Sequence, residues 1–206
     1  MIEINKHMYK SYYYLLCLIV ILLPQAFILP IEASYENHLL ENLEMVILSI
    51  GLITMIRKMC INRIKEIKGF YLACSIFYFI MIARELSFGR VFYPIGIDSH
   101  GEQVFINIHQ LWYGSIVYPL IAILVLIALF FMIKTYKFAQ SDKWICKVPQ
   151  YSISMFIIMM ILSQIIFEKN LIIYLANYGQ LLEECTEILA YCALVMFTKD
   201  IVFKRR

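Results

Sequence analysis

Charged residues are scarce in this chain. Asp, Glu, Lys and Arg make up 16% of its 206 residues, whereas an ordinary soluble domain carries about a quarter. Hydrophobic residues reach 62%, and no segment between the long apolar runs exceeds about 25 residues. A soluble domain beside these runs is therefore excluded. The composition predicts an all-α, polytopic transmembrane helix bundle that forms a single domain over residues 1–206.

Several familiar active-site patterns are also missing. The chain has no phosphate-binding glycine loop, no Gly-x-Ser-x-Gly elbow and no His-Glu-x-x-His zinc motif. Its six cysteines form no Cys-x-x-Cys spacing, so we expect them to pack as small apolar residues. The basic loops are explained by membrane orientation, and they are expected to touch anionic lipids. Nucleic-acid binding is not expected.

Long apolar runs are what the sequence has in abundance. Lys6 and Lys10 precede the first run, but no small-x-small cleavage site follows it, which favours a retained span over a signal peptide. Pro24 is expected to kink this span, and Ser34 is a candidate N-cap for the next. Residues 102–111 are expected to form an interfacial helix or the first turns of span four. The six predicted spans are 12–30, 35–56, 70–92, 112–136, 149–167 and 178–198.

The basic residues predict the orientation of these spans. If the N-terminus is cytoplasmic, 15 of the 18 lysines and arginines fall in cytoplasmic segments. This bias follows the positive-inside rule. It predicts six spans with both termini in the cytoplasm, and we expect the chain to lie in the bacterial cytoplasmic membrane.

Three glutamates stand in the last predicted span. Glu183 and Glu187 are four residues apart and Glu184 and Glu187 are three apart, so their carboxylates share one helix face. Gln180 and Tyr191 extend the same stripe. A charge in the hydrocarbon region costs roughly 2.5–3.5 kcal/mol by insertion measurements. Three carboxylates together therefore indicate a site, although they name no substrate.

Two other spans and one loop bring ionisable groups to the same side of the membrane. Glu41 and Glu44 lie in the outer part of span two, and Arg84 and Glu85 lie near the outer end of span three. At about 1.5 Å per residue, these groups are on the order of 5–15 Å below the outer ends of their helices. His109 approaches from the same side. The agreement in depth predicts a carboxylate, histidine and arginine cluster.

Three simpler explanations compete with a functional site. A buried salt bridge could pair Arg84 with one glutamate, but six glutamates face this single arginine. The helix dipole favours glutamates near the outer ends of spans two and six, but its effect fades within the first turn. It therefore explains Glu41 better than Glu187. An outward-opening, water-filled cavity could also keep the carboxylates hydrated.

Carboxylates held close together either share protons or bind a cation. Glutamates with one imidazole suit Fe, Mn or Zn, and carboxylates alone suit Ca, Mg or Mn. Helix bundles build such centres from inward-facing glutamates, although the Glu-x-x-His signature of di-iron proteins is absent. We expect a divalent metal without selecting its identity. The candidate metal ligands are Glu41, Glu44, Glu183, Glu184 and Glu187.

One segment carries a resemblance. Residues 83–90, Ala-Arg-Glu-Leu-Ser-Phe-Gly-Arg, are similar to an Arg-Glu-x-Ser-Trp-Gly-Gln/Arg segment in a group of uncharacterised prokaryotic membrane proteins. That group also has an early glutamate-bearing helix, an Asn-x-His loop and a late glutamate helix. Asn107 and His109 match the loop, and Phe88 replaces the tryptophan. The resemblance implies no named activity. It gives weight to Glu44, Arg84, Glu85, His109 and Glu184.

Three functions remain open at this point. The first is a membrane-embedded, metal-dependent hydrolase acting on a lipid-like or small substrate from the outer side, with Arg84, Glu85 and His109 as catalytic candidates. The second is a cation- or proton-coupled transporter. The apolar faces below Glu44 and Glu187 argue against a simple channel but leave alternating access open. The third is a non-catalytic assembly subunit whose polar cluster sets helix packing.

Overall fold

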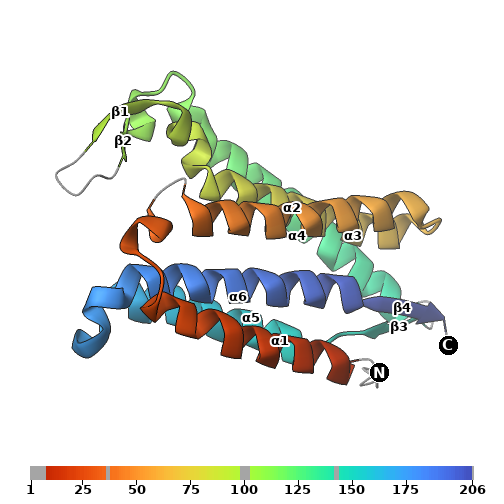
Figure 1. The fold of residues 1–206 in the computed structure, drawn as a ribbon. Helices are drawn as coiled ribbons and strands as arrows, with labels where there is room; N and C mark the ends of the chain where they lie inside the picture. The colour runs from red at the N-terminus through yellow and green to blue at the C-terminus, as the bar shows by residue number, and fades with distance from the viewer. Residues whose placement is uncertain (1–7, 36–37, 98–102, 142–143, 206) are drawn as a thin grey trace. The chain divides into compact units, whose positions relative to one another are not determined.

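A computed structural model describes residues 8–35, 38–97, 103–141 and 144–205 of the chain. Helices dominate these residues, and the strands are limited to two short two-stranded sheets. The fold divides into two compact units. Figure 1 shows the helices and strands of both. The predicted all-α class is therefore confirmed in its main feature.

Unit 1 combines the two ends of the chain, Met1–Ile47 and Cys146–Lys204. Helix α6 is at its centre and packs along α5 and α1, as Figure 1 shows. The middle of the chain is absent from this unit, so α6 meets segments that precede it by more than 130 residues. Its elements are α1 (Met8–Leu22), η1 (Leu23–Phe27), η2 (Ile31–Ser34), the start of α2 (Leu39–Ile61), α5 (Gln150–Ile161), the π-helical η5 (Leu162–Phe167), η6 (Ile173–Tyr178) and α6 (Gly179–Asp200).

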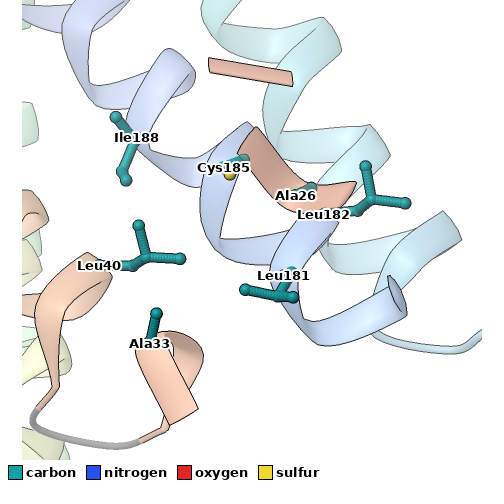
Figure 2. Packing of buried hydrophobic residues seen from close by; sticks show 7 residues of the cluster. All are labelled: Ala26, Ala33, Leu40, Leu181, Leu182, Cys185 and Ile188. Atoms are coloured by element: carbon teal, nitrogen blue, oxygen red, sulfur yellow. The ribbon is translucent and has the colours of Figure 1, made fainter. Parts of the chain in front are cut away.

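Apolar side chains on two sides of α6 form the core of unit 1. On one side, Leu181, Cys185 and Ile188 meet Ala33 and Leu40, as Figure 2 shows. On the other side, Met159 of α5 packs on Leu189 and Ala190, with α1 side chains around them. Burial on both sides explains why the residues of α6 from 185 to 191 are all buried. The same burial carries Glu187 into the interior of the unit.

Unit 2 contains Leu48–Ile145 and the last two residues. Helices α3 and α4 pack along one another, and Thr135 of α4 donates a hydrogen bond of 2.7 Å to the carbonyl of Glu66. A short antiparallel hairpin, β1 with β2, follows α3. The remaining elements of unit 2 are α3 (Lys65–Glu85), η3 (Ser87–Phe92), β1 (Pro94–Ile97), β2 (Gln103–Phe105), η4 (Ile108–Gln110) and α4 (Gly114–Ser141). Strands β3 (Trp144–Lys147) and β4 (Val202–Arg205) form the other sheet and belong to neither unit alone, because the unit boundaries after Ile145 and Lys204 fall within them.

A glycine allows α2 and α3 to approach closely in unit 2. A Cβ atom placed on Gly51 would lie 2.3 Å from a ring carbon of Tyr78. Tyr78 is 1% exposed and its ring has little room to move. Small residues commonly permit such contacts between membrane helices. Gly51 therefore has a packing role here.

Most predicted spans correspond to helices, with differences at their ends. Among the residues that the structure describes, four helical stretches are long and apolar enough to cross a membrane: the stretch Ile31–Ile61 that includes α2, then Lys65–Glu85, Gly114–Gln140 and Gln150–Phe167. The first predicted span contains the shorter apolar stretch Ser11–Phe27. The sixth corresponds to α6, which is 22 residues long but carries three glutamates. Six crossings, cytoplasmic termini and a single transmembrane domain stay predictions.

Three local predictions were wrong. Span three does not continue to residue 92, because α3 ends at Glu85 and the chain turns through positive φ angles at Phe88 and Gly89. Ser34 is not the N-cap of α2: it ends η2, and its hydroxyl donates to the carbonyl of Ile31. Residues 103–105 form strand β2 rather than a helix, and only the short η4 precedes α4. Residue 102 lies outside the described residues.

Candidate functional site

Glu187 is the best-defined polar centre of unit 1. It is 5% exposed, and it lies where α6 passes the π-helical segment η5. The Ser163 hydroxyl donates a hydrogen bond of 2.9 Å to Glu187 Oε1, and the Gln164 amide donates to the same oxygen. The Tyr191 hydroxyl, one turn along α6, donates to Oε2 at 3.2 Å. Three neutral donors from two segments therefore stabilise one buried carboxylate.

Two consecutive residues of the π-helical segment η5 donate to Glu187. The π-helical turn covers Leu162–Phe167, and both Ser163 and Gln164 reach the same carboxylate oxygen. Single π-helical turns within α-helices occur frequently at functional sites. The hydrogen bonds of Glu187 thus coincide with this distortion of the helix.

Glu44 is the second carboxylate of this centre. It is fully buried in α2, four residues after Leu40, which belongs to the core around α6. One carboxylate oxygen of Glu44 and one of Glu187 lie within 4.8 Å of each other. Two ionised carboxylates that are buried at this distance repel each other strongly unless positive charge compensates them. The geometry therefore suits a shared proton or a bound cation.

The other predicted metal ligands have different surroundings. Glu41 is half-buried in the first turn of α2, where the helix dipole favours an acidic residue. Glu183 and Glu184 are half-buried on α6. Of the five predicted glutamate ligands, Glu44 and Glu187 belong to a group whose carboxylate oxygens lie within 4.8 Å of one another. Metal-ligand roles for Glu41, Glu183 and Glu184 stay predictions.

The predicted catalytic residues lie in unit 2. Arg84 and Glu85, neighbours at the end of α3, form an ion pair with 2.7 Å between Arg84 Nη2 and Glu85 Oε1. This ion pair fits the salt-bridge explanation for Arg84 in part, because the Glu85 side chain is buried whereas that of Arg84 is 37% exposed. His109 is exposed in η4, and its backbone N–H donates to Asn107 Oδ1 at 3.0 Å. Its ring centroid lies 6.4 Å from that of Tyr118. The aromatic-belt alternative for His109 agrees with this position.

Sequence reasoning missed two residues of the centre, Ser163 and Gln164. They are consecutive polar residues within a predicted span, in its otherwise apolar part from residue 155 to residue 167. Polar residues within membrane segments usually face the protein interior or mark a functional path. That signal was available in the sequence, but it does not reveal their partner. Comparison with protein-family models, curated proteins and solved structures found no significant match, so these roles rest on the chain's own geometry.

Proposed function

We propose that the chain is a multi-pass integral membrane protein of the bacterial cytoplasmic membrane, with six spans and cytoplasmic termini. The four long apolar helices and the basic loops support this arrangement. Helix α6 is included as a span because its 22 residues extend about 33 Å, slightly more than the hydrocarbon thickness. The buried hydrogen bonds of Glu187 offset part of the cost of placing that carboxylate in the membrane.

The function proposed for this centre is divalent metal binding by Glu44 and Glu187. The observation that carries it is the buried pair of carboxylate oxygens within 4.8 Å. Two carboxylates balance the charge of one divalent ion, and a metal between them would replace repulsion by attraction. Mn²⁺ is the first ion to test, because carboxylate sites accept it and it belongs to the predicted set of Fe, Mn and Zn.

The reaction proposed for a metal-loaded centre is hydrolysis of a lipid-like substrate in the membrane. A bound divalent ion supplies an activated water and polarises a carbonyl or phosphoryl oxygen. The chain's own residues would hold Glu187 in a fixed orientation through Ser163, Gln164 and Tyr191. Catalytic roles for Arg84, Glu85 and His109 stay predictions.

One observation favours a second candidate, proton-coupled transport. Ser163, Gln164 and Tyr191 already donate three hydrogen bonds to Glu187 without any metal. Such donors stabilise one ionised carboxylate, so the Glu44–Glu187 pair could hold a single proton. Intramembrane carboxylates commonly act as proton carriers in transporters.

Elemental analysis tests the metal proposal directly. The protein is purified in mild detergent without added metal or chelator, beside Glu44→Gln, Glu187→Gln and the exposed control Glu168→Gln. Near-stoichiometric Mn, Fe or Zn in the wild type and Glu168→Gln, lost from both other variants while thermal unfolding stays cooperative, supports it. The metal-loaded protein is then incubated in phospholipid vesicles, and lipid products are measured by mass spectrometry.

Elemental analysis, together with a proton-transport assay, separates the metal-binding hydrolase from the proton-coupled transporter. Absence of metal from the wild type across several preparations, including one dialysed against MnCl₂, overturns the metal proposal. Proton transport by reconstituted wild-type protein, lost in Glu187→Gln and kept in Glu168→Gln, would then support the transporter. If metal is bound but no lipid product forms, the result would support the proposed metal site and contradict the proposed hydrolase activity.

A further inference from the structure

A cavity of about 290 Å³ lies between α3, η3 and α4 within unit 2. Every residue that lines it is apolar. A polar ligand would lose its hydrogen bonds to water there without replacement, so the cavity suits a hydrocarbon. The lining includes Ala83, Leu86 and Phe88 on one side and Val117, Leu120 and Leu124 on the other.

The protein surface around the cavity is apolar and exposed, so lipid chains in a membrane would be next to the cavity. Within the most apolar stretch of α4, only 6% of the residues are buried. Leu120, which lines the cavity, is itself 51% exposed, and Ile116 and Ile123 beside it are exposed as well. In a membrane this surface contacts lipid chains. The cavity therefore borders the hydrocarbon phase rather than water.

The size of the cavity distinguishes a lipid chain from a protein helix. A helix with its side chains is about 10 Å across, so a single turn of 5.4 Å occupies on the order of 400 Å³. That volume exceeds the 290 Å³ available. A single extended acyl chain is much thinner, so a segment of one chain can enter. The occupant that fits is therefore part of one hydrocarbon chain.

A strained turn forms part of the cavity wall. Ser87 and Phe88 have φ angles of 45° and 52°, and Gly89 has a φ of 90°. Side-chain-bearing residues rarely adopt this region, and such strain concentrates at functional sites. The Tyr113 hydroxyl donates a hydrogen bond of 3.3 Å to the carbonyl of Phe88. The turn is thus held in the position that places Phe88 in the cavity wall.

A positively charged residue is next in the chain to the cavity wall. Arg90 directly follows Gly89, which lines the cavity, and its Nε donates a hydrogen bond of 3.0 Å to the carbonyl of Ile106. That bond uses one of the five N–H donors of a guanidinium, whose planar fork matches a phosphate group. The Phe88 ring centroid lies 6.3 Å from that of Tyr118. A phospholipid has the complementary pattern, an apolar chain joined to an anionic phosphate.

We propose that this cavity binds one acyl chain of a membrane phospholipid whose phosphate is held by Arg90. The proposal concerns unit 2 alone and does not depend on metal binding by Glu44 and Glu187. Loss of lipid binding and loss of metal are measured separately, so either proposal can fail without the other.

Photo-crosslinking in vesicles tests the proposal. Wild-type protein is reconstituted with a trace of phosphatidylglycerol that carries a diazirine near the end of one acyl chain, and crosslinked peptides are mapped by mass spectrometry. We expect adducts concentrated at residues 79–89 and 117–124. Ala83→Phe and Val117→Phe, which fill the cavity from its two sides, should lower these adducts about tenfold, as expected when roughly two methylene groups lose their burial. Leu126→Phe, on an exposed part of α4, should leave them unchanged.

The phosphate contact is tested with a second probe. Diacylglycerol bearing the same diazirine chain lacks the phosphate, so the wild type should label less with it, and Arg90→Gln should remove the difference. Adducts spread evenly over exposed residues such as Leu126 and Phe130, unaffected by both filling variants, would overturn the proposal. Protein–protein crosslinks at the cavity in place of lipid adducts would overturn it as well. Cooperative thermal unfolding of each variant excludes misfolding, and Val117→Phe serves alone if Ala83→Phe fails to fold.

Discussion

Ser163 and Glu187 are joined by a buried hydrogen bond of 2.9 Å that links the π-helical segment η5 to α6. The two residues are 24 positions apart, and neither is exposed by more than 5%. A hydroxyl that donates to a buried carboxylate stabilises its charged form and restricts its rotation. This contact therefore contributes both to the packing of unit 1 and to the orientation of its central carboxylate.

Removal of this hydrogen bond is expected to destabilise the protein. Ser163→Ala should lower the free energy of unfolding by about 1 kcal/mol, between the average for polar contacts in membrane proteins and the larger value for bonds to charged groups in water. Unfolding in SDS or urea from mild detergent measures the change. Thr54→Val, at an exposed hydroxyl on α2, is the control and should have a smaller effect. Equal losses in both variants would contradict a special role for Ser163.

Metal binding should appear as ligand-dependent stability. If Mn²⁺ binds the folded centre, a concentration about 100 times its dissociation constant should add about 2.7 kcal/mol to the free energy of unfolding. A thermal unfolding series with MnCl₂ measures this effect. Glu187→Gln should abolish it, whereas the exposed control Glu168→Gln should retain it. A rise of equal size in Glu187→Gln would place the ion elsewhere.

Close packing at Gly51 predicts an unusual sensitivity to a single methyl group. Gly51→Ala normally favours a helix, but the added Cβ would lie 2.3 Å from the buried Tyr78 ring. We expect a loss of about 1–3 kcal/mol in stability, typical of overpacking. Adding Tyr78→Leu to Gly51→Ala should recover part of that loss, because it removes the ring. A double-mutant cycle of unfolding free energies measures the coupling, and simple additivity would contradict it.

The predicted orientation can be tested with Cys60, which is exposed in the last turn of α2. With both termini in the cytoplasm, this end of α2 faces the cytoplasm. A membrane-impermeant maleimide should therefore label a variant that retains only Cys60 in inside-out vesicles and leave it unlabelled in intact cells. Labelling from outside the cell would reverse the predicted topology.

Cys146 in β3 gives a pH-dependent comparison on the same side. Burial raises the pKa of the Cys146 thiol above its ordinary value. A raised pKa means less thiolate at a given pH, so a variant that retains only Cys146 should react with maleimide more slowly at pH 7.5 than a free model thiol. The deficit should shrink as the pH rises. A rate equal to that of the model thiol would show that Cys146 is accessible to solvent.

Local properties of the sequence were sufficient to predict where most of the helices form. Long apolar runs predict helices in a membrane because only internal hydrogen bonding satisfies the backbone there. The three-residue and four-residue spacings also predicted that Tyr191 shares a face with Glu187, and the two are hydrogen-bonded. The end of α3 was harder to predict, because the turn at Phe88 depends on a tertiary contact with Tyr113.

Only the tertiary structure decided which carboxylates come together. Glu183, Glu184 and Glu187 occupy one helix face and are equivalent in the sequence pattern, yet Glu187 is the one that packs against η5 and lies near Glu44. Each residue along a helix turns the side chain by about 100°, so the partner of a given glutamate depends on how neighbouring helices are rotated and spaced. Those rotations follow from packing between distant segments. Sequence spacing predicts a shared face, and the packing of whole helices determines what that face meets.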